Sequence, residues 1–469
     1  MPRPSPPGYT GSMTTTTNPL DTLRGAVRGT VVTRGDPSYD VSRRVYNGLH
    51  DRRPAVVVHA VDAGDVIAAV LYAREHSLPL AVRGGSHSVA GFGTVDDGLV
   101  VDLSRMRGIR VDPEARTARA EGGATWGDFN HATHAFGLAT TGGVISTTGI
   151  GGLTLGGGMG HLSRRCGLSC DNLIAADVVT AEGTLVSCDA ERHPDLFWAL
   201  RGGGGNFGIA VSLAYRLHPV SDVFGGLTCY PLGPDVARAW ERMNEDAPVE
   251  LNTIFVIALG PEEPFLPERW HGRPICAAFT CFSGPAADDD KVLALLDGLG
   301  PVVGRFMERM PYPVINTVFD EQLPPGLFHY WKGAFSRDLT DGAIDAHMAY
   351  GTTMPSMESD TAIFPIDGAC HEVGPEETAF AYRDAVFSHS IGATWSTGAA
   401  DAEANIAWTR AYEKALRPHT EQGGYVNFMD ADDQDRVRVN YRQNFDRLRT
   451  VKRRYDPDNV FRLNQNIAP

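Results

Sequence analysis

The residues best suited to chemistry lie in the stretch VRGGSHSVAGFG, residues 82–93, where one histidine stands among glycines and serines. A lone histidine is most often structural or exposed, and a metal role needs partner ligands at a defined spacing, which His87 lacks. His131 and His134 share one helix face without an accompanying glutamate, which predicts a surface position. A neutral imidazole is also a nucleophile. A structural role and a covalent bond to a cofactor therefore both remain open for His87.

Two separate loops, 83–88 and 142–152, are rich in Gly, Ser and Thr. Successive backbone N–H groups in such loops form anion-binding concavities, although tight turns alone have the same composition. No Gly-x4-Gly-Lys-Ser/Thr run exists, and the Gly203–Gly208 match to Gly-x-Gly-x-x-Gly follows a helical pattern and precedes a strand-like one. That order is the reverse of a dinucleotide fold. Two loops of this composition favour a dinucleotide such as FAD.

Length and charge exclude several classes of protein. A chain of 469 residues predicts two domains, with three as the alternative. Its net charge of −15 and lack of a long Lys/Arg block argue against nucleic-acid binding. No run of 18 apolar residues occurs, so no membrane span is expected. The first 20 residues have no apolar core and predict a disordered tail rather than a secretory signal, so we expect a cytoplasmic protein.

The cysteines predict buried thiols. There are seven, an odd number scattered along the chain, which argues against a disulfide framework. Cys166/Cys170 and Cys276/Cys281 each lack a second pair at zinc-site spacing, and no metal site is expected.

Hydrophobic periodicity predicts the elements that position the loops. Helices are predicted over 62–76, 126–136, 195–200, 286–298 and 402–419, and an amphipathic helix over 435–455. Strands are predicted over 80–82 and 99–103, with a hairpin over 174–187. Residues 142–160 hold too many glycines for any regular element. From His218 to about Ala400, Pro-rich turns alternate with short apolar and aromatic runs, which predicts an α+β domain with an antiparallel sheet.

Five motifs together resemble the berberine-bridge-enzyme-like branch of the FAD-linked oxidases, in the vanillyl-alcohol oxidase and p-cresol methylhydroxylase superfamily. They are RGGSHS (83–88), the glycine-rich run 142–173, DLFWALRGGGGNFGI (195–209), GGYVNFMD (423–430) and the segment 440–467. The resemblance covers residues 47–469. It implies an α+β fold in which a two-part FAD-binding domain carries an inserted substrate domain built on an antiparallel sheet. The expected boundaries are a tail over 1–20, the FAD-binding domain over 21–220, the substrate domain over 221–405, and a C-terminal segment over 406–469 that returns to the FAD-binding domain.

The resemblance implies that His87 carries FAD through its 8α-methyl group. Some members add a second bond from a cysteine in the second loop, but Ile145 stands at that place and Cys166 lies well past the loop. A single covalent link is therefore predicted. The resemblance implies a further set of cofactor-binding residues: Arg83, Gly84, Gly85, Ser86, Ser88, Gly143, Val144, Ser146, Thr147, Gly149, Gly151, Gly152, Asn172, Val178, Tyr425, Asn427 and Asn464.

The catalytic base is not fixed by the motifs. Many family oxidases carry a Tyr-x-Asn-Tyr run, but this chain has Tyr425-Val426-Asn427-Phe428, and a phenylalanine has no ionisable group. Tyr425, Tyr330 and Glu372 are the candidates, with packing or a surface position as the alternative for all three. A tyrosine acts as a base near pH 7 only when its pKa is strongly depressed.

The leading functional hypothesis is a flavin oxidase. Its substrate would be an alcohol, an amine or a polyketide-like natural product, with a sugar or a hydroxynicotine-type amine as the short-substrate alternative, and O2 would accept the electrons. A second hypothesis is a flavin-N5-oxide-type oxygenase or oxidative cyclase of antibiotic or polyketide biosynthesis, with which Phe428 and the single link agree. A third is a flavoprotein with a structural, non-redox FAD. The expected partners are a small molecule and O2, without nucleic acid or membrane, in a monomer or homodimer.

Overall fold

The computed structural model describes residues 18–396 and 399–469. Of the tail expected over 1–20, residues 1–17 lie outside the described part. Helix α1 (Pro19–Ala26) takes up its end, because Asn18 accepts a hydrogen bond from the Leu20 N–H and a proline occupies the first helical position. Pro19 and Leu20, at the end of the range expected to be a tail, therefore lie in a helix.

The N-terminal part of the FAD-binding domain is a four-stranded sheet in the order β1-β2-β4-β3. Strands β2, β4 and β3 run parallel, and β1 pairs antiparallel with β2. Helix α3 makes the crossover between β2 and β3, as the helical stripe predicted. The apolar strands are buried on both faces, as parallel strands covered by helices are. The elements are β1 (Thr30–Thr33), α2 (Tyr39–Ser42), β2 (Val56–His59), α3 (Ala63–Glu75), β3 (Leu80–Arg83) and β4 (Leu99–Asp102).

The second part is a five-stranded antiparallel sheet in the order β5-β6-β10-β8-β9. The predicted hairpin is β8 and β9, and the predicted helix over 195–200 is α8. A short helix, α5, forms within residues 142–160, where no regular element was expected, so that expectation was wrong. The elements are β5 (Ile109–Asp112), β6 (Thr117–Glu121), α4 (Trp126–His134), β7 (Leu138–Ala139), α5 (Ile150–Leu155), α6 (Ser163–Cys166), α7 (Ser169–Asn172), β8 (Leu173–Val179), β9 (Leu185–Asp189), α8 (Pro194–Leu200), β10 (Ile209–Arg216) and β11 (His218–Pro219).

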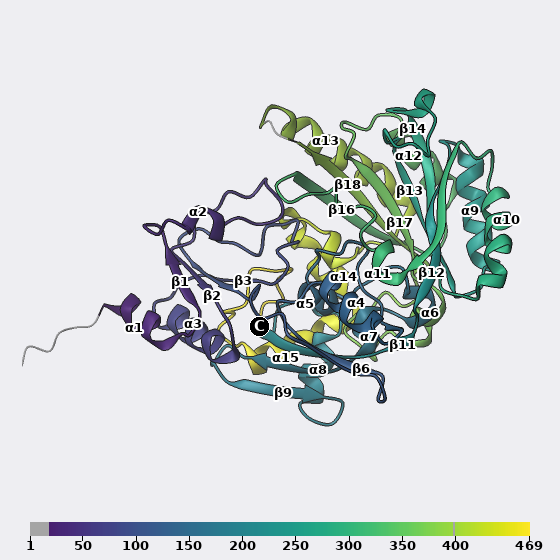
Figure 1. Ribbon diagram of the computed structural model, residues 1–469. Helices are drawn as coiled ribbons and strands as arrows, with labels where there is room; N and C mark the ends of the chain where they lie inside the picture. The colour runs from purple at the N-terminus through teal and green to yellow at the C-terminus, as the bar shows by residue number, and fades with distance from the viewer. Residues whose placement is uncertain (1–17, 397–398) are drawn as a thin grey trace, which may run out of the picture.

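The substrate domain is a seven-stranded antiparallel sheet in the order β15-β12-β14-β13-β17-β18-β16. Helices α9, α10, α12 and α13 cover one of its faces, and the other face packs against the FAD-binding domain (Figure 1). The elements are β12 (Asp222–Pro231), α9 (Pro234–Asp246), β13 (Leu251–Leu259), β14 (Pro274–Phe282), α10 (Asp289–Asp297), β15 (Gly304–Pro311), α11 (Tyr312–Ile315), β16 (Phe328–Ser336), α12 (Asp341–Gly351), β17 (Asp360–Pro365), β18 (Phe387–Trp395) and α13 (Ala399–Leu416).

Helix α13 corrects one expected boundary. Its Trp408, Tyr412 and Leu416 pack with Tyr330 and Trp395 of the substrate sheet. A division between residues 405 and 406 therefore cuts a helix that covers this sheet. The chain returns to the FAD-binding domain only after α13.

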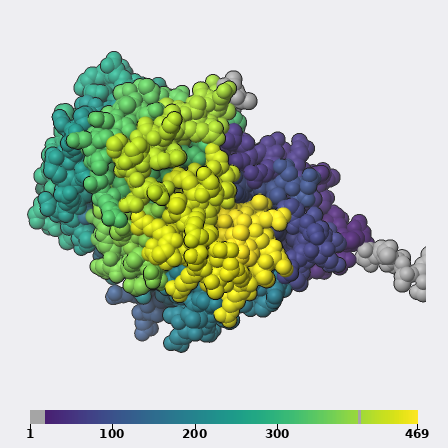
Figure 2. Space-filling model, turned by 180° about the vertical axis from the view of Figure 1, so that it is seen from behind, coloured from purple at the N-terminus to yellow at the C-terminus, as the bar shows by residue number. Residues whose placement is uncertain are grey.

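The returning segment does not form the single helix predicted over 435–455. It divides into α14 (Val437–Tyr441) and α15 (Phe445–Tyr455), separated by Arg442 at φ +44. Both helices nevertheless contribute to the core of the FAD-binding domain, which explains the continuous apolar spacing. From behind, the C-terminal residues cover the junction between the N-terminal part and the substrate domain (Figure 2).

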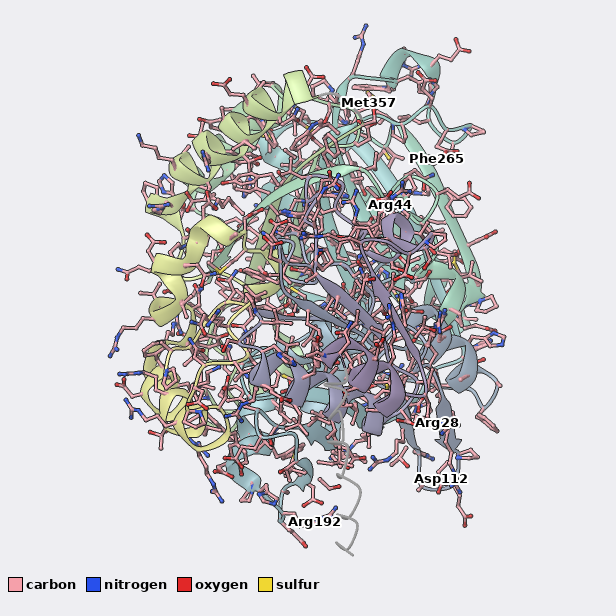
Figure 3. All side chains as sticks on the ribbon, turned by 90° about the vertical axis from the view of Figure 1, so that its left-hand side faces the viewer. Arg28, Arg44, Asp112, Arg192, Phe265 and Met357 are labelled. Carbon is pink, nitrogen blue, oxygen red and sulfur yellow. The ribbon has the colours of Figure 1, made fainter. Side chains whose placement is uncertain are left out.

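Labelled side chains in Figure 3 show which part of the chain forms each end of the molecule. Phe265 and Met357 mark the end formed by the substrate domain, and Arg192 marks the opposite end (Figure 3). All seven cysteines are free and buried, as the sequence predicted. Among residues 18–396 and 399–469, no helix is long and apolar enough to cross a membrane, and no group of three metal-ligating side chains occurs.

Candidate active site

The first glycine-rich loop leaves a series of backbone donors free. It follows β3 directly, and none of the five N–H groups from Gly84 to Ser88 finds a hydrogen-bond acceptor in the described chain. Ser86 adopts φ +69, in the left-handed region. A turn that mixes right- and left-handed residues points successive N–H groups at one anion. Because unpaired N–H groups are costly unless a ligand or water binds them, this loop fits a phosphate-bearing ligand.

The second glycine-rich loop lies against the first. A Cβ atom added at Gly85 would lie 2.2 Å from the Gly149 nitrogen, and one added at Gly149 would lie 2.4 Å from the Gly85 nitrogen. Any side chain at either position would therefore separate the loops. The two loops therefore meet, and the close approach explains both glycines.

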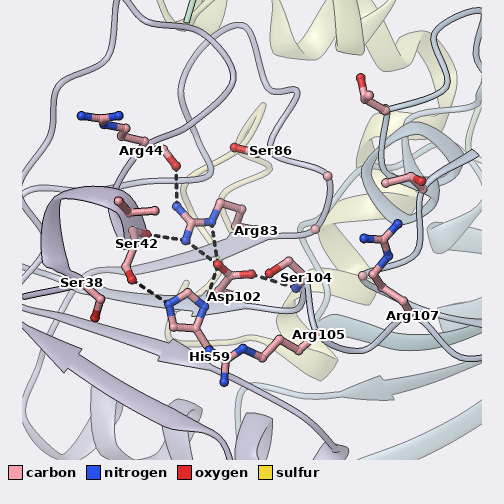
Figure 4. Close-up of a pocket in the computed structure, with 16 residues that line it drawn as sticks. Ser38, Ser42, Arg44, His59, Arg83, Ser86, Asp102, Ser104, Arg105 and Arg107 are labelled. Carbon is pink, nitrogen blue, oxygen red and sulfur yellow. Dashed lines mark hydrogen bonds and ion pairs between the residues drawn. The ribbon is translucent and has the colours of Figure 1, made fainter. Parts of the chain in front are cut away.

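Arg83 holds the start of the first loop against neighbouring elements. Its guanidinium donates to Asp102 and to the carbonyl oxygens of Ser42 and Arg44 (Figure 4). Burial alone would raise the pKa of Asp102, but its hydrogen bonds to His59 and Ser104 and the charge of Arg83 outweigh burial and hold that pKa well below its usual value. Arg83 thus ties the loop to β4 and α2, and it also lines the neighbouring cavity, so its predicted contact with the cofactor stays a prediction.

A cavity of about 540 Å³ opens beside the first loop, between the two parts of the FAD-binding domain. Gly84, Gly85 and Ser86 line it together with Arg44 and Arg105. Neither arginine forms an ion pair with any described residue. Free N–H groups, glycines that allow close approach and unpaired cations are a donor set that fits the diphosphate of FAD.

His87 is held in one orientation and kept neutral. Its ring stacks on Tyr46, with ring centres 3.9 Å apart, and Nε2 lies 2.9 Å from Thr147 Oγ1 of the second loop. Burial, reinforced by nearby His329, lowers the pKa of His87 to about 3. Burial and the nearby Asp320 carboxylate raise the pKa of Tyr46 to about 12. At neutral pH the imidazole is therefore uncharged, the state in which a ring nitrogen is nucleophilic.

The substrate domain holds the second loop in place. Asp320 accepts hydrogen bonds from the N–H and the hydroxyl of Ser146, and the Asn316 amide donates to the Gly143 carbonyl at 2.5 Å. Ile145 is half-buried between these two points. Cys166 lies on α6, and burial raises the pKa of its thiol to about 11. A protonated thiol is a poor nucleophile.

Several predicted cofactor residues support the backbone of the site. Asn172 donates to the carbonyls of Cys166 and Leu168, Asn464 donates to that of Gly205, and Asn427 donates to that of Leu153. Val178 is fully buried on β8. Of the rest, Ser88 accepts from the Phe92 N–H, Gly151 and Gly152 lie in α5, and Val144 packs against the core beneath the substrate sheet.

Tyr425 cannot act as the base at neutral pH. It is 2 % exposed, and its hydroxyl accepts from the Gly158 N–H at 2.9 Å and from the Asn427 amide at 2.8 Å. Burial raises its pKa far above that of a free tyrosine. A base needs the opposite shift, so Tyr425 is a structural residue of the site.

Tyr330 and Glu372 lie away from the loops. Successive residues of a strand point to opposite faces, and Tyr330 points to the face covered by α13. There its hydroxyl donates to Asp432 and accepts from Arg410. Glu372 is exposed at the end of a single-turn helix, η3 (Gly368–Glu372). Both side chains lie away from the two glycine-rich loops, and their catalytic roles stay predictions.

Four residues that sequence reasoning missed lie around the site: Tyr46, His329, Trp331 and Asp360. His329 also stacks on Tyr46, with ring centres 5.1 Å apart, and meets Trp331 edge to face at 5.7 Å. The sequence signal was the period-2 pattern of FHYWKGAFS, which sets His329 and Trp331 on the face opposite to Tyr330. Which face meets the cofactor domain is determined by tertiary packing.

Fold and site together define a class of protein: an FAD-linked oxidoreductase whose two-part FAD-binding domain carries an inserted antiparallel substrate domain. Residues 54–189 match the FAD binding domain family, and residues 424–468 match the berberine and berberine-like family. An FAD-linked oxidoreductase of Bacillus subtilis, YgaK, is 32% identical over 94% of this chain and 97% of its own. The chain belongs to the berberine-like FAD-linked oxidoreductases.

Relatives with named activities show the same extent of similarity. The (R)-6-hydroxynicotine oxidase of Paenarthrobacter nicotinovorans is 29% identical over 95% of this chain and 97% of its own. The crystal structure of 6-hydroxy-D-nicotine oxidase from Arthrobacter nicotinovorans superposes with a TM-score of 0.84 at 27% identity, over 94% of this chain and 98% of the other. A xylooligosaccharide oxidase from Myceliophthora thermophila, with a TM-score of 0.81 at 24% identity, shares the fold.

Proposed function

We propose that this protein oxidises a small alcohol or amine of natural-product size, that its FAD is bonded covalently through His87 alone, and that O2 takes up the electrons. When bound, FAD supplies the acceptor for a hydride and its electron pair. The chain's own residues hold the diphosphate on the first loop, orient the substrate and exclude water. The geometry of His87 carries the proposal, since the ring is neutral, stacked and held within reach of both loops.

The face of the substrate sheet that looks toward the FAD-binding domain favours an aromatic or otherwise apolar substrate. Phe428 packs edge to face on Tyr425 and Trp331 and lies 5.5 Å from Phe364, ring centre to ring centre. Such a surface suits a flat ring better than a sugar, which needs many hydrogen-bonding partners. We therefore place hydroxynicotine-like amines and aromatic alcohols before oligosaccharides as candidate substrates.

Acid precipitation tests the covalent bond. We expect the wild-type pellet to keep its flavin absorbance and the His87→Ala pellet to lose it, because alanine has no nucleophile, while FAD remains bound non-covalently by the two loops. Cys166→Ala is the matched control and should retain attached flavin. A His87→Ala protein whose flavin stays attached would contradict the assignment.

The same protein tests the reaction class. On anaerobic mixing with candidate alcohols and amines, a substrate should bleach the flavin band, and admitted O2 should restore it with one peroxide formed for each substrate oxidised. Label from ¹⁸O2 in the product would instead support an oxygenase, which the named relatives above do not favour. Turnover without bleaching would support a non-redox role.

A further inference from the structure

An acidic residue without a partner lies on the face of the substrate sheet that meets the FAD-binding domain. Asp360 opens β17 and pairs with Gly392 of β18, which in turn pairs with Trp331 of β16. The side chains of Asp360 and Trp331 lie on the same face of the sheet, on either side of Gly392. A Cβ atom added at Gly392 would lie 3.4 Å from Asp360 Oδ1 and 3.2 Å from Trp331 Nε1. The carboxyl group of Asp360 and the indole N–H of Trp331 therefore both lie next to Gly392, which has no side chain to separate them.

A continuous row of rings connects this point to His87. His87 stacks on Tyr46, Tyr46 on His329, and His329 meets Trp331 edge to face. Trp331 also meets Phe428 edge to face, with ring centres 6.0 Å apart. Asp360 thus lies at the substrate-domain end of the row that begins at the proposed flavin attachment.

The polar atoms of this cluster lack partners within the described chain. His329 is 1 % exposed, and its Nε2 has no hydrogen-bond partner there, nor does Trp331 Nε1. The Asp360 carboxyl group forms no hydrogen bond or ion pair with residues 18–396 or 399–469. The strands on either side bring Ala258 and Gly392 to it, neither of which carries charge, and burial lowers the pKa of His329 to about 4, so that it is neutral. Buried polar atoms are nearly always paired, so the two unpaired ring nitrogens, next to the half-buried carboxyl group of Asp360, indicate a ligand.

We propose that Asp360 is the catalytic base, and that the substrate is an aromatic compound bearing one hydroxyl or neutral amine on the carbon that is oxidised. The inference rests on the proposed function. The O–H or N–H proton passes to the Asp360 carboxylate as the C–H hydride, with its electron pair, passes to bound FAD. The C–O or C–N single bond becomes a double bond, so the substrate loses two hydrogens. Trp331 Nε1 and His329 are the groups positioned to hydrogen-bond the substrate heteroatom.

The titration of Asp360 suits this role. Burial raises the pKa of Asp360 to about 7. A general base works best with a pKa near the working pH, because enough of it is deprotonated and it still binds a proton well. Phe428, which packs on Trp331, cannot take a proton, so the base must be another group. Burial holds Tyr425 protonated, so Asp360 rather than Tyr425 is the group available as the base.

Asp360→Asn tests the proposal through flavin reduction. With benzyl alcohol, benzylamine and (R)-6-hydroxynicotine as probes under anaerobic conditions, the wild-type rate should rise as the pH passes through about 7. The variant should be about 10²- to 10⁴-fold slower and lose that pH dependence. Asp341→Asn, which alters an exposed carboxylate on α12, is the control and should match the wild type. A variant within threefold of the wild type at every pH would overturn the assignment.

Two further measurements separate this proposal from the proposed function. If no probe reduces the wild-type flavin, the proposed substrates fail, and Asp360 is judged by the binding of benzylamine followed through the flavin spectrum. Binding should then tighten between pH 6 and pH 8 in the wild type only. Thermal unfolding gives the second readout. Because the folded-state pKa is raised, Asp360 costs the wild type stability as the pH rises from about 4 to about 7, and Asp360→Asn should remove that loss. Unchanged binding and unchanged pH dependence in the variant would refute the inference.

Discussion

At the scale of single residues, the two nitrogens of His87 are not equivalent. Nε2 lies 2.9 Å from Thr147 Oγ1, whereas Nδ1 lies 3.4 Å from Thr148 Oγ1, which is at best a weak contact. A neutral imidazole has one N–H and one lone pair, and the hydrogen bond at one nitrogen fixes the proton there. If Nε2 carries the proton toward Thr147, Nδ1 keeps the lone pair. We therefore expect the flavin bond at Nδ1.

Thr147→Val tests this assignment. Valine has nearly the same shape but no acceptor, so the imidazole loses the group that fixes its proton, and we expect flavin attachment to slow by about tenfold, in line with the roughly 1 kcal/mol of one hydrogen bond. Attachment is measured as acid-stable flavin against time after FAD is added to apoprotein. Thr148→Val is the matched control and should attach flavin at the wild-type rate. Slower attachment only in Thr148→Val would place the bond at Nε2.

The sequence predicted the loop side of the site and missed the sheet side for a physical reason. The loops 83–88 and 142–152 are contiguous stretches, and their Gly, Ser and Thr content by itself favours turns that bind an anion through backbone N–H groups. The sheet side joins Trp331 and Asp360 across two strands far apart in the chain. Tyr330 was chosen and Trp331 was not, although they are neighbours, because a shift of one residue in a strand moves a side chain to the other face. Only the packing of the whole sheet decides which face meets the cofactor.

At the scale of elements, α15 shows the same limit. Its periodicity predicted a helix over 435–455, and the residues of that stripe are indeed buried, but the backbone turns at Arg442, where φ is +44. The guanidinium of Arg442 stacks 3.6 Å above the ring of Tyr382 and pairs with Asp384 and Glu421. Those contacts are with the substrate-domain side, so no local pattern in 435–455 could reveal them. The spacing of hydrophobic residues predicts which residues are buried better than it predicts whether the helix that carries them is continuous.

The attachment of α15 to the FAD-binding domain depends on one buried pair. Lys452 and Asp456 are both 0 % exposed and 2.6 Å apart, and Lys452 Nζ also donates to the carbonyls of Asn206 and Phe461. Lys452→Met leaves Asp456 charged without its partner, so we expect a loss of about 3–5 kcal/mol in the free energy of unfolding. Arg453→Met removes an exposed charge from the same helix and should change stability by less than about 0.5 kcal/mol. Denaturant unfolding compares them, and equal effects would show that the buried pair contributes little.

At the scale of the whole molecule, buried histidines set the response to acid. Burial lowers the pKa of His161 and of His347 to about 3, and burial with nearby His347 lowers that of His389 well below its usual value. In the unfolded chain these groups take up protons near pH 6.5. Below that pH the unfolded state therefore binds more protons than the folded state, and stability falls. Asp360 and Asp430, with raised pKa values of about 7 and about 6, oppose this trend.

These three histidines, together with His87 and His329, outnumber the two aspartates, so we expect a lower Tm at pH 5 than at pH 7. His347→Gln should be less stable than the wild type at pH 7, since it loses hydrogen bonds to Tyr412 and His389. Its Tm should nevertheless fall less on acidification. His131→Gln, at an exposed position, should follow the wild type. A wild-type Tm that rises toward pH 5 would show that the aspartates dominate instead.

The discontinuous FAD-binding domain has a consequence for how the protein is made on the ribosome. The loops 83–88 and 142–152 emerge early, but Tyr425 meets Gly158, and Ile467 meets Asn206, only after the substrate domain has been synthesised between them. The glycine-rich segments are therefore without these contacts while the substrate domain is being synthesised. A nascent chain that lacks Tyr425 and Ile467 lacks two groups that close the core of the FAD-binding domain, so this domain completes its core only after the substrate domain has been made.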